Sequence, residues 1–213
     1  MIKIEQTEIF GWESAIRGMR NPLNSWNKSD SGWDGFGECN GYSIGETDLS
    51  LMKKLVAAGA DHSKFMRMLT VYCDITAPLY WWKEYDTYKV GTVANSCSTM
   101  HKIHDKEFEL DDFSCEHLCG AALQALVFTI GTLNMYRDAY NDGKLKEDWW
   151  QMIQLLPSSY NQKRTVQLNY AVLRNMYRSR KNHKLDEWHT FCEWVETLPH
   201  AKELICETQK GEG

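Results

Sequence analysis

The segment from Trp149 to Leu185 reads WWQMIQLLPSSYNQKRTVQLNYAVLRNMYRSRKNHKL and carries the strongest physical signal in the chain. It contains no Asp or Glu, and its positive charges are Lys163, Arg164, Arg174, Arg178, Arg180, Lys181 and Lys184. The whole chain has a net charge of −5, so the residues outside this segment carry −12. Because segregated charge produces a focused positive field, we expect this segment to serve an anionic ligand.

The spacing after Leu156-Pro-Ser-Ser159 predicts a long helix over residues 161–181. At about 100° per residue, one stripe of this helix carries Val166, Asn169, Leu173, Met176, Tyr177 and Arg180. The stripe is mainly apolar and should face the core, so its Asn and Arg need partners there. One solution is an internal carboxylate. The other is a cleft in which Asn169 and Arg180 hold a phosphate or carboxylate, with Arg174 and Arg178 at the rim.

The remaining pattern predicts an α+β protein, mainly helical, with a small antiparallel sheet. A chain of 213 residues suits a single domain, 1–213. Residues 24–48 are expected to form a long aromatic-containing loop, and residues 206–213 a flexible tail. The expected strands are 1–5 and 66–75, with 85–93 either β-like or a helix ending near Tyr88. The expected helices are 48–59 with Asp48 as its cap, a buried helix 114–140, 146–155, and 185–205 broken near Pro199.

Composition excludes several classes of protein. With 43% hydrophobic and 25% charged residues, wholesale disorder is excluded. The negative net charge argues against duplex nucleic acid as a partner. The longest apolar run, Leu118 to Ile130, is too short to span a bilayer, and the N-terminus lacks the apolar core of a signal peptide. We therefore expect a cytoplasmic protein that does not bind membranes.

The seven cysteines are scattered and are expected to be reduced thiols. Cys115, His117 and Cys119 form the one tight cluster, but a closed zinc site needs four converging ligands and no second cluster supplies the rest. We expect small core thiols at a helix start and no metal site.

Two further clusters have ordinary explanations. His101 and His104 with Asp105 could form a metal pair, although a polar turn before the next helix fits better. Cys97 near His101 could be a nucleophile, although no third group orients it. The pairs Trp81-Trp82 and Trp149-Trp150 could stack on bases or a flavin, and core or subunit packing is the alternative.

Three stretches, taken in their order, resemble the flavin-dependent thymidylate synthases. Ala58-Gly-Ala-Asp-His62-Ser63, followed by Met68-Leu-Thr-Val-Tyr72, resembles the family's Gly-His-x-Ser…Phe-Thr-Phe segment. Residues 82–101 lie where the family carries its Arg-His-Arg…Ser signature. Leu156-Pro-Ser-Ser-Tyr160 and the helix expected after it resemble the family's Leu-Pro-x-Ser-Thr-Tyr segment and its Asn- and Arg-bearing helix. Ala15-Ile-Arg17 resembles a short Ala-x-Arg element.

The resemblance implies roles for individual residues. Arg180 would bind a nucleotide phosphate, and Asn169 and His62 would lie near the flavin. The Arg-His-Arg positions fall on Thr87, Tyr88 and Lys89, which leaves one positive charge where the family has more. With the basic helix included, the predicted phosphate-binding residues are Arg180, Arg174, Arg178, Lys89, Gln162 and Ser98. The predicted cofactor-binding residues are His62, Ser63, Asn169 and Tyr88, and no catalytic residue is assigned.

Two functions follow from this resemblance. One is a diverged flavin-dependent enzyme that modifies a pyrimidine nucleotide, with FAD as cofactor and methyl transfer as the reaction. The other is a non-catalytic nucleotide-sequestering or sensing protein that keeps the phosphate pocket without turnover. A structural or partner-binding protein is a third class. By the same resemblance the chain should form a homo-oligomer, a tetramer.

Overall fold

The fold class is α+β, with antiparallel sheets and many helices, as predicted. The computed structural model describes residues 2–39 and 41–207, so most of the predicted tail, residues 208–213, lies outside the described residues. The described residues cluster into two compact units. Among the described residues, the first unit comprises residues 2–3, 75–87 and 95–165, and the second comprises residues 4–39, 41–74, 88–94 and 166–207.

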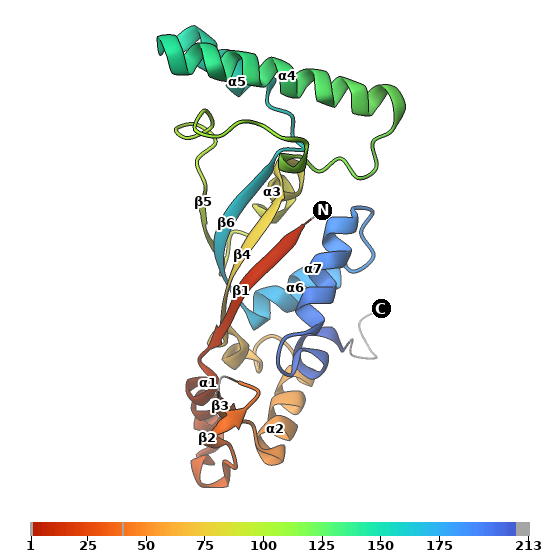
Figure 1. Ribbon diagram of the computed structural model, residues 1–213. Coiled ribbons are helices and arrows are strands. Elements are labelled where there is room, and N and C mark those ends of the chain that lie inside the picture. Colours follow the sequence, from red (N-terminus) through yellow and green to blue (C-terminus); the bar gives the residue numbers. More distant parts are fainter. Residues whose placement is uncertain (1, 40, 208–213) are drawn as a thin grey trace. The chain divides into compact units, whose positions relative to one another are not determined.

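Four strands form the larger sheet in the order β1-β4-β6-β5 (Figure 1). Their bounds are β1 (Lys3–Phe10), β4 (Thr70–Pro78), β6 (Asn161–Asn169) and β5 (Val93–Ser96). In β6 the buried residues Gln162, Val166 and Leu168 recur at even spacing, which is the period of a strand. The prediction of one helix over residues 161–181 is therefore wrong for its first half, and Val166 and Asn169 do not belong to a helical stripe.

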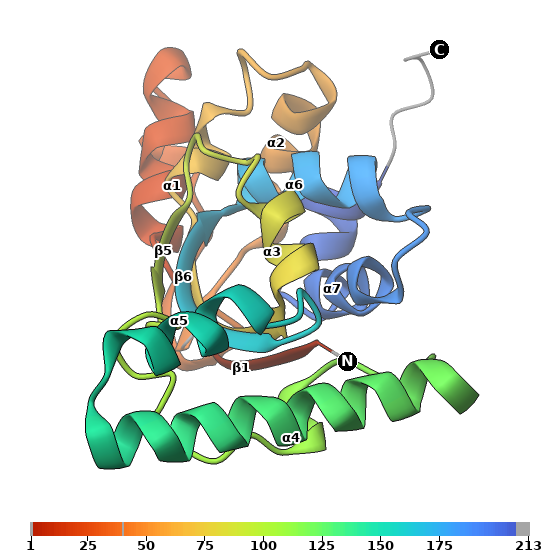
Figure 2. The same ribbon diagram turned by 90° about the horizontal axis from the view of Figure 1, so that it is seen from above.

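The first unit is built around helices α3 (Leu79–Tyr85), α4 (Gly120–Gly143) and α5 (Lys146–Leu155), with a 3₁₀ turn η4 (Leu110–Asp112). Helices α4 and α5 run alongside each other in both views (Figures 1 and 2). Their shared core consists of Ile103, Phe108, Phe113, Leu126, Ile130, Leu133 and Met152. Trp81 and Trp82 are fully buried, and Trp82 Nε1 donates to the Gln162 carbonyl at 2.9 Å. This pair is therefore core packing, one of its two expected uses.

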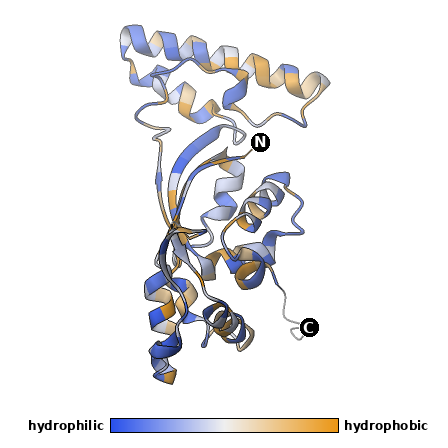
Figure 3. Cartoon of the chain, turned by 60° about the horizontal axis from the view of Figure 1, so that its bottom comes forward, coloured by the Kyte–Doolittle hydropathy of each residue, from blue (hydrophilic) through white to orange (hydrophobic). Residues whose placement is uncertain are grey.

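Helix α4 is the largest departure in the first unit. A buried helix was expected over residues 114–140, whereas α4 begins at Gly120 and buries Leu126, Ile130 and Leu133 alone among its described residues. Val127, Phe128 and Met135 are exposed, and Figure 3 shows apolar colour along this long helix. Cys119 precedes its first turn and is exposed, so the expectation of a core thiol is wrong for it, whereas the half-buried Cys115 packs against the core. The α5 helix has the predicted bounds.

Besides its share of the larger sheet, the described part of the second unit contains four α-helices and two short strands. They are α1 (Trp12–Arg20), β2 (Gly32–Gly37), β3 (Gly41–Ser43), α2 (Glu46–Ala57), α6 (Tyr170–Arg180) and α7 (Asp186–Glu196). The short turns are η1 (Asn21–Leu23), η2 (Trp26–Lys28), η3 (Lys64–Arg67) and a π-helical turn η5 (Lys202–Cys206). The predicted break near Pro199 separates α7 from η5. The strand predicted over residues 66–75 begins only at Thr70. In the region 85–93, which was expected to be β-like or the end of a helix, α3 ends at Tyr85 and β5 begins at Val93.

The expected loop over residues 24–48 contains an antiparallel hairpin formed by β2 and β3. It is anchored by a buried ion pair, since Arg20 Nε lies 2.6 Å from Asp48 Oδ1 and the side chains are 3% and 0% exposed. The other Asp48 oxygen accepts hydrogen bonds from the Ser29 and Ser31 hydroxyls. Asp48 therefore does not cap α2, whose N-cap residue is Gly45. A carboxylate this deeply buried needs such partners to offset its desolvation.

Replacing Asp48 with Asn should remove the charge partner of Arg20 and lower the free energy of unfolding by about 3–5 kcal/mol. Asp138→Asn is the matched control, because Asp138 pairs with Arg137 while 64% exposed, and surface pairs contribute about 0–1 kcal/mol. Urea denaturation measures both losses. Equal losses in the two variants would show that the buried pair does not anchor the hairpin.

Thiol reactivity should follow burial. Desolvation raises the pKa of Cys39, Cys73 and Cys192 to about 12, so almost no thiolate forms on these residues near pH 8. Cys97 and Cys119 are exposed and should react first with iodoacetamide in the native protein. Peptide mapping by mass spectrometry, with and without denaturant, gives the order of labelling. Native labelling of Cys73 as fast as that of Cys97 would contradict this prediction.

Candidate functional site

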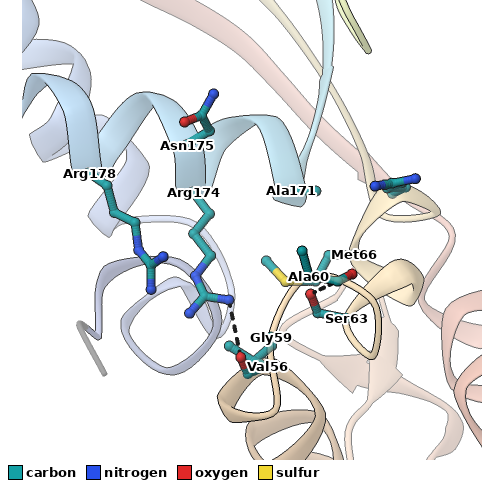
Figure 4. A pocket seen from close by; sticks show the side chains of 10 residues that line it. Val56, Gly59, Ala60, Ser63, Met66, Ala171, Arg174, Asn175 and Arg178 are labelled. Carbon is teal, nitrogen blue, oxygen red and sulfur yellow. Dashed lines mark hydrogen bonds between the residues drawn. The ribbon is translucent and has the colours of Figure 1, made fainter. Parts of the chain in front are cut away.

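A cavity of about 220 Å³ in the second unit receives two of the predicted arginines, Arg174 and Arg178 (Figure 4). Helix α6 forms one wall, and the chain between α2 and η3 forms the other. Both guanidinium groups extend from α6 toward Gly59 (Figure 4). Ser63, Arg67 and Asn175 also line the cavity. The expected concentration of positive charge around a hollow is present at this site.

The α6 helix begins where Asn169 ends strand β6. Asn169 is the N-cap residue, and its Oδ1 accepts a hydrogen bond from the Val172 amide at 3.0 Å. A side-chain acceptor at this position satisfies one of the unpaired amides of the first helical turn. Gly91 approaches the same point, because a Cβ there would lie 3.0 Å from Asn169 Nδ2. Asn169 thus sets where α6 starts and which face carries the arginines, and it does not lie in mid-helix as predicted.

Arg174 is held by the end of another helix. It is 9% exposed, and its guanidinium donates to the Val56 carbonyl at 3.4 Å, in the last turn of α2. The carbonyl end of a helix carries partial negative charge, which favours a cation. Arg178 follows four residues later and is half-buried. Since like charges at this spacing repel each other, an anion bound between Arg174 and Arg178 would relieve that repulsion.

The turn after α2 carries two residues predicted to bind the cofactor, His62 and Ser63, and places them in different cavities. Gly59 adopts a φ of +103°, a left-handed conformation that glycine accepts without steric cost. Its carbonyl accepts hydrogen bonds from the His62 and Ser63 amides, both at 3.1 Å. Ser63 is buried and lines the arginine cavity. His62 is exposed and lines a different, mainly apolar cavity with Leu55 and Phe65.

Arg180 is ordered by aromatic rings. Its Nε donates to the Tyr88 hydroxyl at 2.9 Å, and its guanidinium carbon lies 4.8 Å from the Trp188 ring centroid and 5.6 Å from that of Tyr88. These are cation–π distances. Arg180 is not among the residues that line the arginine cavity. Arg174 and Arg178, predicted at the rim of the site, line this cavity, and Arg180, predicted inside the site, packs against two rings. Lys89, next to Tyr88, is exposed.

Gln162 and Ser98 belong to the first unit, and both have local structural bonds. Gln162 donates to the Cys97 carbonyl at 2.7 Å and accepts from Arg164 Nε at 3.0 Å. Ser98 Oγ accepts from the amides of Met100 and His101. Neither side chain lines the arginine cavity.

Arg164 accounts for another part of the basic segment. It stacks on Trp82 at 4.1 Å and pairs with Asp86 at 2.8 Å. Not every cation in the segment therefore serves the cavity.

Sequence reasoning missed Arg67, Asn175 and Trp188. Arg67 lies far from the acid-free segment, and the neutral Asn175 contributes nothing to a charge count. Trp188 lies just beyond the end of that segment. Its closeness to the basic residues in the sequence was the one feature that could have identified it. Over residues 2–39 and 41–207 no three His, Cys, Asp or Glu side chains come together as a metal site would require. Within the same residues, no helix has the length and apolar character needed to cross a bilayer.

Comparison with solved structures identifies the fold of this chain. No family model and no curated protein sequence matches the chain. A flavin-dependent thymidylate synthase ThyX from Helicobacter pylori, complexed with FAD and dUMP, superimposes with a TM-score of 0.71 at 15% identity, covering 95% of this chain and 97% of that chain. A second structure of the Helicobacter pylori ThyX with FAD and dUMP gives 0.66 at 16% identity, covering 96% and 97%.

A UMP/dUMP methylase, PolB from Streptomyces cacaoi bound with 5-Br dUMP, is also similar. Its TM-score is 0.65 at 13% identity, and the match covers 95% of this chain and 93% of that chain. The resemblance stated from the sequence motifs is thus confirmed at the level of structure: over nearly its whole length, the chain has the fold of the flavin-dependent thymidylate synthases.

Proposed function

We propose that this chain binds a pyrimidine nucleotide of the dUMP or UMP type and that Arg174 and Arg178 hold its phosphate. The observation that carries the proposal is the cavity lined by these two guanidinium groups. Planar guanidinium groups form paired hydrogen bonds with phosphate oxygens. The similar structures were solved with dUMP or 5-Br dUMP, which supports the choice of ligand.

The size of the cavity limits what one chain can hold there. Pockets for drug-sized ligands occupy roughly 300–1,000 Å³, and this one measures about 220 Å³. It fits a phosphate or a pyrophosphate group better than a whole dinucleotide. A nucleotide phosphate held by Arg174 and Arg178 would therefore leave no room in this cavity for FAD. When bound, FAD would supply the redox chemistry.

A homo-oligomer, a tetramer by resemblance, would complete such a site with residues from other copies. The exposure of Val127, Phe128 and Met135 along α4 supports this part of the proposal. Exposed apolar surface of this kind commonly marks an interface between proteins.

The two proposed functions differ in whether the bound nucleotide is chemically modified. Thr87 and Tyr88 occupy positions where the resemblance implies arginine and histidine, and Thr87 donates to the Glu84 carbonyl. Neither side chain replaces a guanidinium fork. Tyr88 instead contacts Arg180, so a cation is still held beside this segment. A diverged flavin-dependent enzyme that modifies pyrimidine nucleotides is the first candidate, and a non-catalytic nucleotide-sequestering or sensing protein is the second.

Replacing Arg178 with Gln should weaken dUMP binding by roughly 10- to 150-fold, because a charge-assisted hydrogen bond contributes about 1.5–3 kcal/mol. Arg180→Ala should weaken it by roughly 30- to 700-fold, or about 2–4 kcal/mol, if Arg180 also contacts the phosphate. Lys53→Gln, an exposed change on α2, is the control. Isothermal titration calorimetry measures all three. If Arg178→Gln binds dUMP with unchanged affinity, the arginine cavity is not the phosphate-binding site. If Arg180→Ala binds dUMP with unchanged affinity, Arg180 has only a packing role.

Material purified from its native source distinguishes the two functions. An enzyme of the proposed class should carry flavin, visible as yellow colour and as FAD released on denaturation and identified by mass spectrometry. With flavin, a folate carbon donor and a reductant, it should convert dUMP to a product heavier by a methyl group. A colourless protein that binds dUMP and yields no such product would support sequestration or sensing.

A further inference from the structure

A second cavity, in the first unit, combines positive charge with aromatic rings and is used by nothing proposed above. It measures about 300 Å³ and is lined by Met100, His101, His104, Tyr140, Lys144, Lys146 and Trp149. Four of these seven residues are Lys or His. None of the described residues that line it is Asp or Glu, although the chain as a whole has a net charge of −5. Its lining is therefore opposite in sign to the protein as a whole.

Three segments are tied together to form this cavity. The loop after β5 supplies His101 and His104, the end of α4 supplies Tyr140 and Lys144, and the first turn of α5 supplies Lys146 and Trp149. Trp149 Nε1 donates to the Met100 carbonyl at 2.9 Å, which joins α5 to the loop. Asn141 Nδ2 donates to the His104 carbonyl at 3.0 Å, which joins α4 to the same loop. Lys144 belongs to the same network, since its Nζ donates to Asn141 Oδ1 at 3.1 Å, so the walls are preorganised by hydrogen bonds.

The charged and aromatic groups are placed together. Lys144 Nζ lies 5.1 Å from the Tyr140 ring centroid, and the His104 ring packs edge-on against the same ring at 4.8 Å. Lys144 adopts a φ of +52° as the C-cap of α4, although Gly143 precedes it. A lysine in this left-handed conformation costs of order 1 kcal/mol. The chain therefore keeps a lysine, with its charge over an aromatic ring, at a position that suits glycine.

One acidic group outside the lining, Asp105, pairs with neighbouring cations. Asp105 lies 3.0 Å from Lys102 Nζ and 3.3 Å from His104 Nε2. The hydrogen bond from Lys102, together with the charges of His104 and Lys144, lowers the pKa of the Asp105 carboxyl. Its negative charge is thus shared among Lys102, His104 and Lys144, and it offsets only part of the positive charge around the cavity.

We infer that this cavity binds a small phosphorylated aromatic compound, with its phosphate between Lys144 and Lys146 and its ring against Trp149. The volume suits one ring and one phosphate group. Lysines bind phosphate as point charges, and an indole offers a stacking surface that accepts many planar rings. The inference does not depend on the nucleotide proposed for the arginine cavity, because none of its residues line that cavity.

Phenyl phosphate is the probe, because it carries one ring and one phosphate and nothing else. In calorimetric titrations, Lys144→Gln/Lys146→Gln should bind it about ten-fold or more weakly than the parent protein. Both lysines are exposed, so the variant should fold. Lys53→Gln/Lys202→Gln removes two exposed charges from the other unit as the matched control and should bind like the parent. Arg178→Gln should likewise leave this titration unchanged.

Three outcomes decide the inference. Equal affinity in the parent and in Lys144→Gln/Lys146→Gln would overturn it, as would loss of binding in Arg178→Gln alone, because the probe would then occupy the arginine cavity. In the parent, inorganic phosphate should bind about ten-fold or more weakly than phenyl phosphate. Equal affinity for the two would overturn the assignment of the ring to Trp149. Titration of uridine and uridine monophosphate then shows whether a nucleotide or another phosphorylated ring fits better.

Discussion

The hydrogen bond between the Asn169 carboxamide and the Val172 amide fixes the position on which the proposed site depends. It marks the point where a strand becomes a helix, at the boundary between β6 and α6. A shift of one residue would turn the helix by about 100° and would move Arg174 and Arg178 away from the cavity. Whether these arginines line the cavity therefore depends on Asn169, a neutral residue that determines where the helix starts.

The described arginines of this protein are held in different ways. Arg20 is buried against a carboxylate, Arg174 rests on the carbonyl end of a helix, and Arg180 packs between two aromatic rings. A full ion pair cancels most of the field of a guanidinium group, whereas helix ends and rings hold the group while leaving much of its charge effective. The buried ion pair of Arg20 thus serves the stability of the hairpin.

The two cavities concentrate positive charge in different ways. In the second unit, guanidinium groups from one helix face a glycine-containing turn. In the first unit, lysines and histidines surround a ring-lined hollow that contains no carboxylate among its described lining residues. Planar guanidinium groups favour a defined orientation of phosphate, whereas lysines act as point charges and leave orientation to the stacked ring. This difference underlies the separate ligands proposed for the two cavities.

The sequence alone determined features that depend on local composition. The α+β class, the α5 helix from Lys146 to Leu155 and the absence of acids from the segment Trp149 to Leu185 were all predictable, because periodicity and charge can be counted along the chain. The motif order also pointed to the fold that the superpositions later gave.

Only the tertiary structure decided whether residues 161–169 are strand or helix, because β6 is stabilised by pairing with β4 and β5, which are distant in sequence. Likewise, only packing showed that Arg180 contacts Tyr88 while Arg174 reaches the cavity, and that most of α4 is exposed. Local sequence fixes the propensity and charge of each segment. Which side chains meet depends on contacts between segments that are far apart in the chain.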